Sequence, residues 1–166
     1  MTPARSNDSL GQVNIVDELH AVTAALRNAG VPHAVCGGIA VTAYGATRTT
    51  KDIDIVIPPD HVTAALRAVA GLGYNIPAGP MTFGAGTAQE RHVQRVNKIV
   101  GQHHMVVDFL LADAAYTGVL DDRVDVDLPA GTITFVSRET LLRMKRLAGR
   151  PIDLADIEKL EGDDGG

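Results

Sequence analysis

The chain has 166 residues, of which 45% are apolar and 21% are charged, a composition typical of a globular protein with one sizeable core. No apolar run approaches the ~20 residues that span a bilayer. The net charge of −5 argues against nonspecific coating of nucleic acid, and the single cysteine, Cys36, excludes an internal disulfide. We therefore expect a cytoplasmic protein without membrane contact, with a single domain over residues 12–161, a flexible N-terminus over 1–11 and a flexible tail over 162–166.

Helical and extended segments alternate in the first half of the chain. Apolar residues recur at helical spacing before Gly30 and Pro32, which are a typical helix end and stop. Asp60 is positioned to cap the helix that follows it. The predicted elements are a helix over 13–29, a strand over 33–36, a short helix over 38–44, a strand over 52–57 and a helix over 61–72.

The second half begins with residues 76–89, whose Gly, Pro, Ala and Thr content predicts a mobile loop. Strands follow over 91–100 and 105–111, joined by a turn at Gly101 and Gln102, and a hairpin is predicted from 124–128 and 132–136. Ser137 is expected to cap a helix over 138–148, and a last helix runs over 151–160. This order predicts an α+β fold, a mixed β-sheet packed with helices and followed by a short C-terminal helical segment.

A diglycine and two aspartates are the most informative motif. Gly37 and Gly38 follow a short strand, and Asp52 and Asp54 lie one residue apart on the next strand. Because side chains alternate along a strand, the two carboxylates point to one face while Ile53, Ile55 and Ile57 point into the core. This arrangement is a platform for Mg²⁺, and the diglycine lets a phosphate approach backbone N–H groups, which indicates nucleotide chemistry.

A third aspartate, Asp108, lies inside the apolar strand predicted over 105–111. A lone carboxylate in such a strand is costly unless it is paired or bound to a metal. If its strand lies beside that of Asp52 and Asp54, three carboxylates converge on a two-metal site for in-line displacement. The alternative is that Asp52 and Asp54 are strand-end turn residues and that Asp108 belongs to an ion pair.

The diglycine, the 13-residue spacer and the Asp-x-Asp motif resemble the signature of the nucleotidyltransferase (polymerase-beta-like) superfamily. Residues 37–41 and 48–54 resemble its AbiEii/MenT branch, the toxins of type IV-like toxin–antitoxin pairs, over about residues 30–160. The C-terminal stretch is similar to the third and fourth motifs of that branch at Ser137, Leu141, Lys145, Ala148, Arg150, Asp153 and Asp156.

The resemblance implies the nucleotidyltransferase fold and the transfer of a nucleoside monophosphate from an NTP to a hydroxyl, with release of pyrophosphate. Mg²⁺, with Mn²⁺ as an alternative, is then held by Asp52, Asp54 and Asp108, and Asp108 either binds the second metal or helps to deprotonate the acceptor. The implied catalytic residues are Asp52, Asp54, Asp108, Lys145 and Asp153. The implied nucleotide-binding residues are Gly37, Gly38, Arg48, Thr50, Lys145, Arg150 and Asp156.

Some of these residues also have structural interpretations. Arg48 either reaches a phosphate or braces its loop, Lys145 either contacts the triphosphate or lies along the surface, and Arg150 with Asp153 also fits a local ion pair. Thr50 precedes the metal motif, and a phosphate attached there would oppose nucleotide binding.

The acceptor implied by the resemblance is the 3′ end of tRNA, guided by the basic residues between Arg91 and His104, and the implied protein partner is a cognate antitoxin. The alternatives are transfer to a small molecule such as an antibiotic, transfer to a protein side chain, a noncatalytic binding module, and a sugar-nucleotide transferase. His103 and His104 lack the spacing of a closed zinc site and are interpreted as surface residues.

Overall fold

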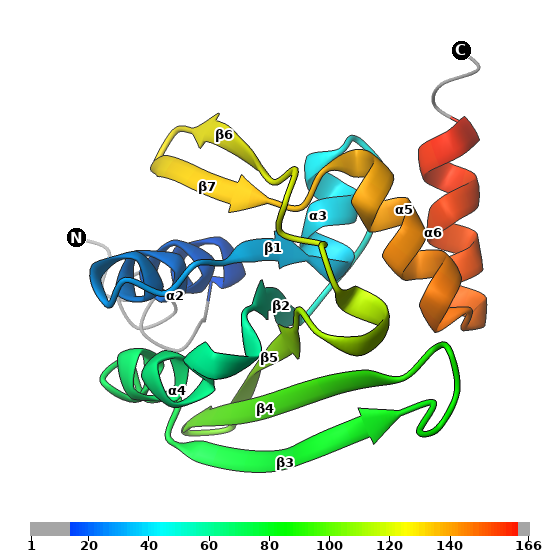
Figure 1. The fold of residues 1–166 in the computed structure, drawn as a ribbon. Coiled ribbons are helices and arrows are strands. Elements are labelled where there is room, and N and C mark those ends of the chain that lie inside the picture. The colour runs from blue at the N-terminus through cyan, green and yellow to red at the C-terminus, as the bar shows by residue number, and fades with distance from the viewer. Residues whose placement is uncertain (1–13, 163–166) are drawn as a thin grey trace.

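The computed structural model describes residues 14–162, so the expectations for residues 1–11 and for most of the tail lie outside the described part of the chain (Figure 1). Gly162, which was assigned to the tail, is instead the last residue of a helix. The helices are α2 (Ile15–Asn28), α3 (Gly37–Ala43), α4 (Val62–Ala70), α5 (Arg138–Ala148) and α6 (Pro151–Gly162). The strands are β1 (Ala34–Cys36), β2 (Asp52–Ile57), β3 (Ile76–Phe83), β4 (Arg91–Val100), β5 (His103–Leu111), β6 (Val124–Leu128) and β7 (Gly131–Phe135).

The strands form one mixed sheet in the order β3-β4-β5-β2-β1-β7-β6. β2 pairs in parallel with β5, and β1 pairs in parallel with β7, whereas the other neighbours are antiparallel. The predicted α+β class, a mixed sheet packed with helices, is therefore confirmed. Since β2 and β5 are neighbours, the two segments that carry the aspartates lie side by side at the centre of the sheet.

The core lies behind β2 as its alternating pattern predicts. Ile53, Ile55 and Ile57 are fully buried, whereas Asp52 and Asp54 point to the opposite face. Helices α2 and α4 pack against each other and add Leu26 and Val69 to this core (Figure 1). One face of β2 is thus wholly apolar, and the other carries Asp52 and Asp54 before it ends in the buried Val56.

The predicted mobile loop over residues 76–89 is wrong in its first part. Ile76–Phe83 is strand β3, which pairs antiparallel with β4 at the edge of the sheet. Proline is tolerated on an edge strand because one side of that strand needs no ladder hydrogen bonds, and the register shifts between Ala78 and Met81, where Gly79 and Pro80 lie. The Gly and Pro content therefore marks an irregular edge strand and not a loop.

The helix termini that position the C-terminal residues were predicted correctly. The Ser137 hydroxyl accepts a hydrogen bond from the Thr140 N–H at the start of α5, and Gly149 ends that helix in the left-handed region with φ +63°. Asp60, in contrast, does not cap α4, because it lies within a short 3-10 helix (Pro59–His61) that precedes it. Within residues 14–162, no helix combines the length and the apolar character needed to cross a membrane.

Candidate active site

A row of side chains crosses the sheet at its centre. Asp54 on β2 is in register with Asp108 on β5, and Asp108 is in turn opposite Arg95 on β4. On the other side, Asp54 is opposite Cys36 at the end of β1. The structure therefore brings Asp54 and Asp108 together on neighbouring strands, as the sequence predicted, and adds an arginine to their row.

Cys36 ends this row as a core residue. Its side chain is buried, and burial, with a further contribution from the charge of Asp54, raises the pKa of the Cys36 thiol well above its usual range. A thiol in this environment is a poor nucleophile. Cys36 is therefore a small core residue.

Gly37 stands directly behind Asp54. Its φ is +67°, and a Cβ atom added to it would lie 2.0 Å from Asp54 Oδ2. Glycine is required here for two independent reasons, a left-handed backbone and close approach of a carboxylate. Gly38 has a related restriction, because a Cβ there would lie 2.9 Å from the Cβ of Thr50. The diglycine thus shapes the wall against which the metal motif packs.

Gly37→Ala is expected to lower the free energy of unfolding by about 1–3 kcal/mol and to reduce any catalytic rate that depends on Asp54 by about a hundredfold, because the carboxylate must move. Gly30→Ala is the matched control, since Gly30 has φ +71° but a Cβ there meets nothing within 4 Å. Thermal unfolding and steady-state kinetics of both variants test this. Equal loss of activity in both would show that backbone strain, and not displacement of Asp54, is responsible.

Asp54 carries an unusual charge state. Burial raises the pKa of Asp54 to about 7, and the nearby carboxylates of Asp108 and Asp52 add to this rise. The positive charges of Lys145 and Arg150 oppose the shift without cancelling it. Near neutral pH this carboxyl group therefore holds a proton for much of the time, and a cation bound beside it would displace that proton.

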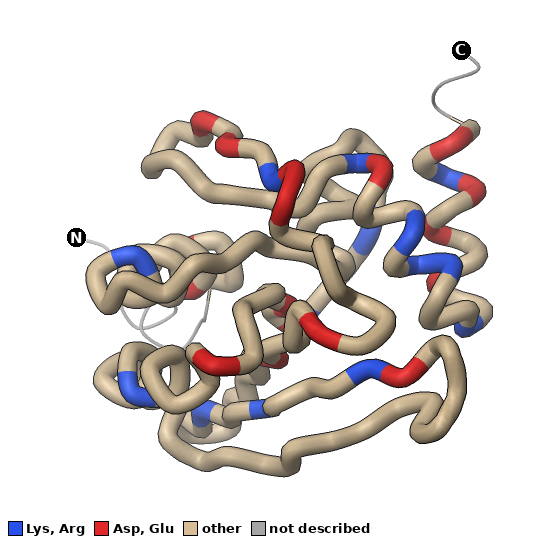
Figure 2. Tube along the Cα trace, in the orientation of Figure 1, with Lys and Arg blue, Asp and Glu red and all other residues tan. Residues whose placement is uncertain are grey.

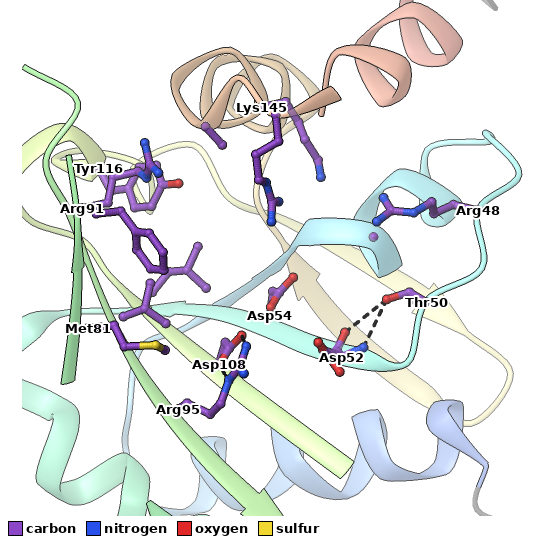
Figure 3. A pocket seen from close by; sticks show the side chains of 16 residues that line it. Arg48, Thr50, Asp52, Asp54, Met81, Arg91, Arg95, Asp108, Tyr116 and Lys145 are labelled. Carbon is purple, nitrogen blue, oxygen red and sulfur yellow. Dashed lines mark hydrogen bonds and ion pairs between the residues drawn. The ribbon is translucent and has the colours of Figure 1, made fainter. Parts of the chain in front are cut away.

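A cleft of about 270 Å³ opens over this row (Figure 3). Its acidic lining residues are Asp52, Asp54 and Asp108. Its basic lining residues are Arg48, Arg91, Arg95, Lys145 and Arg150. Its other lining residues are Gly38, Thr50, Met81, Phe83, Val93, Leu110, Tyr116 and Ala148. Five cations surround three carboxylates, so the cleft suits an anionic ligand together with a small cation.

Asp108 is held in an ion pair. The Arg95 Nε donates to Asp108 Oδ1 at 2.8 Å, and Arg95 Nη2 donates to Oδ2 at 3.0 Å. The side chain of Asp108 is 12% exposed and that of Arg95 is 38% exposed. Both interpretations given to Asp108 from the sequence therefore apply in part, because it joins the carboxylate cluster and is also an ion-pair partner.

Lys145 connects the two C-terminal helices. Its Nζ lies 3.2 Å from Asp153 Oδ1 and 3.0 Å from Asp156 Oδ2, and its side chain is only 7% exposed. It is therefore not a surface lysine, and it reaches the cleft from α5. Asp153 and Asp156 share one face of α6 as their spacing predicts, but neither lines the cleft.

Two arginines hold the same acidic residues from the other side. Arg150 donates two side-chain hydrogen bonds to Asp153, and Arg48 Nη1 lies 2.5 Å from Asp156 Oδ2. Burial alone would raise the pKa of Asp153, but the hydrogen bonds from Arg150 and the charge of Lys145 hold it below its usual value. The structure shows Asp153 and Asp156 in ion pairs behind the cleft, and the catalytic role of Asp153 and the nucleotide contact of Asp156 stay predictions. Figure 2 shows acidic and basic residues close together on α5 and α6, in keeping with these ion pairs.

Arg48 and Thr50 lie on the connection between α3 and β2. Arg48 braces this connection against α6 through Asp156 and also lines the cleft. The Thr50 hydroxyl accepts a hydrogen bond from the Asp52 N–H at 3.2 Å, so it fixes the start of the metal motif (Figure 3). A phosphate on this hydroxyl would compete for that N–H and would add negative charge beside Asp52.

The cleft has an apolar and aromatic wall that no sequence motif indicates. Met81 and Phe83 on β3 and Tyr116 after β5 line the cleft, and the Arg91 guanidinium lies 5.7 Å from the centre of the Phe83 ring. Met81 and Phe83 belong to the segment predicted as a loop, and a loop gives its side chains no predicted direction. Arg91 and Arg95, which were grouped with the histidines as an RNA-guiding stretch, enter the cleft, whereas His103 and His104 lie at the β4–β5 turn and do not.

The donor set fits a hard divalent cation because its oxygen ligands come from carboxylates. Within residues 14–162, no group of three or more His, Cys, Asp or Glu side chains is arranged to hold a metal ion as it stands. This agrees with the ion pair at Asp108, since Arg95 takes both of its oxygens and leaves Asp52 and Asp54. The three predicted metal ligands thus line one cleft, and Asp108 is paired there with Arg95.

The fold is similar to that of solved nucleotidyltransferases. Neither a protein-family model nor a curated protein matches the sequence. Among solved structures, ANT(2″)-Ia in complex with adenylyl-2″-tobramycin matches with a TM-score of 0.59 and 16% identity, over 93% of this chain and 91% of that one. The lincosamide antibiotic adenylyltransferase LnuA, with lincomycin bound, matches with a TM-score of 0.55 and 16% identity, over 87% and 95% of the two chains.

TM1012 of Thermotoga maritima, assigned as a nucleotidyltransferase, matches with a TM-score of 0.60 and 14% identity, over 90% and 93% of the two chains. At these identities the likeness establishes the fold. The chain therefore has the nucleotidyltransferase fold that the sequence predicted, and the AbiEii/MenT branch stays a prediction.

Proposed function

We propose that the protein is a Mg²⁺-dependent nucleotidyltransferase that moves a nucleoside monophosphate from an NTP to a hydroxyl group. The observation that carries this proposal is the parallel register of β2 and β5, which sets Asp54 beside Asp108 in a cleft lined by five cations. The fold likeness to two antibiotic adenylyltransferases supports it. A noncatalytic binding module has no need of three carboxylates clustered in one cleft.

In the proposed reaction the acceptor oxygen forms a bond to the α-phosphorus, and the bond from that phosphorus to the bridging oxygen breaks to release pyrophosphate. Mg²⁺ bound at the aspartates would offset negative charge on the phosphate and help to ionise the acceptor hydroxyl. Asp52 and Asp54 hold the cation, and Asp108 either adds a ligand or takes the hydroxyl proton on a carboxylate oxygen. Lys145, Arg48 and Arg150 surround the triphosphate and stabilise its charge.

For the acceptor we propose the 3′ end of tRNA and, with it, a role as the toxin of a toxin–antitoxin pair. Two arginines, Arg91 and Arg150, and the exposed ring of Phe83 line the cleft, and such a combination binds phosphates and stacks bases. The same cations disfavour a polycationic acceptor. Transfer to a small hydroxylated molecule, such as an antibiotic, is the second candidate, because the chain matches two antibiotic adenylyltransferases over 91% and 95% of their lengths.

Incubation of the purified protein with each α-labelled NTP, Mg²⁺ and total tRNA, beside an Asp54→Ala variant, tests the proposal. Label in RNA with the wild-type protein alone supports the tRNA acceptor and identifies the preferred NTP. Label on protein or on an added antibiotic moves the acceptor to that class. Absence of transfer to every acceptor, together with absence of Mg²⁺-dependent NTP binding, would contradict the enzyme assignment.

Phe83→Ala is expected to raise the KM for an RNA acceptor about tenfold and to change the KM for the NTP much less, since stacking on an aromatic ring contributes about 1–3 kcal/mol per base. Phe83 is 44% exposed, so its loss costs little stability. Ile99→Ala, which removes an exposed apolar side chain at the far end of β4, is the control. A larger effect on the NTP than on the acceptor would place the nucleobase of the NTP at Phe83.

A further inference from the structure

Arg95 and Asp108 form the closest arginine–carboxylate pair that lines the cleft. They lie directly opposite each other on β4 and β5, and both oxygens of Asp108 accept hydrogen bonds from the guanidinium. A bidentate pair of this kind occupies one lone pair on each oxygen of a carboxylate and fixes its orientation. A metal ion that binds Asp108 must therefore compete with the hydrogen bonds and the positive charge of Arg95.

We propose that Arg95 is a positioning residue that occupies Asp108 until a nucleotide arrives, so that the third carboxylate joins the metal site only in the substrate complex. This inference rests on the proposed function, because it concerns the same metal site. It explains why three acidic side chains share one cleft although, within the described residues, no ready three-ligand cluster exists. Before NTP binds, the site is then limited to Asp52 and Asp54.

The exposure of Arg95 makes the exchange feasible. Its side chain lines the cleft and is 38% exposed, whereas the Lys145 side chain is 7% exposed and is fixed between two aspartates. Arg95 can therefore turn without unpacking the core. A guanidinium hydrogen-bonds a phosphate oxygen as well as it does a carboxylate, so a bound triphosphate offers Arg95 a new partner at the moment when Asp108 is released.

Mn²⁺ binding in the absence of nucleotide tests the proposal without relying on catalysis. Arg95→Gln is expected to bind Mn²⁺ about ten- to a hundredfold more tightly than the wild type, because the competing charged hydrogen bonds are gone. Arg91→Gln is the matched control, since it removes the same charge from the same cleft without touching an aspartate. Arg95→Lys, which keeps the charge but loses the bidentate geometry, is expected to lie between wild type and Arg95→Gln, and it serves if the glutamine variant fails to fold.

Equal tightening in Arg95→Gln and Arg91→Gln would reduce the effect to general electrostatics and overturn the proposal. An Mn²⁺ affinity that is unchanged in both Arg95 variants would also overturn the proposal. In that case, Mn²⁺ binding by the wild type that is lost in Asp52→Asn would still support the metal site and the proposed function. If no variant binds Mn²⁺ in a manner that depends on Asp52, then the proposed function and the role of Arg95 fall together. These patterns separate the two failures.

Discussion

Asp54→Asn is expected to abolish nucleotidyl transfer and, at the same time, to stabilise the metal-free protein at pH 8. The substitution keeps the shape of the side chain and removes the charge that binds the cation, so transfer is expected to fall by at least about a thousandfold, the scale seen when a group that stabilises the transition state is lost. The gain in stability follows from burial, because the ionised carboxylate lies beside Asp108 and Asp52. Activity and stability therefore change in opposite directions.

The sign of the pH dependence follows from proton binding. Folding raises the pKa of Asp54 from an ordinary value near 4 to about 7. Between these pH values the unfolded chain releases the proton while the folded chain keeps it, so the free energy of unfolding of the wild type falls as pH rises from about 4 to 7, by at most about 4 kcal/mol. Asp54→Asn lacks this decline. The two proteins should be equally stable near pH 4 and differ most above pH 7.

Denaturant unfolding across pH 4–8, with and without Mg²⁺, measures these effects. Mg²⁺ is expected to raise the stability of the wild type alone, because a ligand that binds only the folded state shifts unfolding by mass action. Asp60→Asn, which alters an exposed acid in the 3-10 helix before α4, is the control and should leave the pH profile unchanged. A less stable Asp54→Asn at pH 8 would show that the carboxylate is better compensated in the fold than its neighbours indicate.

Local patterns were enough to predict the strands that carry the carboxylates. Alternation fixes which way Asp52 and Asp54 point, and an apolar run around one acid singles out Asp108, because both signals depend on a few adjacent residues. Sequence helps less for the edge strand β3, where Gly79 and Pro80 imitate a loop and only the partner strand β4 supplies the missing order. Because β3 was not predicted, the positions of Met81 and Phe83 in the wall of the cleft were not predicted either.

The sequence contains enough information to predict that Arg95 pairs with Asp108, although the predicted strands alone do not state their register. A two-residue turn at Gly101 and Gln102 sets Val100 opposite His103, and counting back along both strands sets Arg95 opposite Asp108. The pairing of Lys145 with Asp153 and Asp156 is different in kind. It depends on the angle between α5 and α6, which no local pattern specifies. The sequence therefore predicts that Asp153 and Asp156 share one face of their helix, but it does not predict that Lys145 contacts that face.

Lys145→Met is expected to lower the free energy of unfolding by about 2–3 kcal/mol and to reduce transfer at least about a hundredfold. Breaking a buried ion pair usually costs about 3–5 kcal/mol, because the remaining charge has no partner. Here the cost is smaller, since Asp153 keeps Arg150 and Asp156 keeps Arg48. The loss of transfer has a separate cause, because Lys145 is the buried cation that reaches the cleft between these aspartates.

The double variant Lys145→Met, Asp156→Asn separates the two effects. Removing one acid along with the lysine leaves Asp153 paired with Arg150 and leaves Arg48 at the edge of the cleft, so much of the lost stability should return. Transfer should not return, because the cation for the triphosphate is still missing. Unfolding and single-turnover transfer measured on the same samples give both values. A double variant that recovers transfer with stability would make Lys145 only a link between α5 and α6, and the triphosphate would then be held by Arg48 and Arg150.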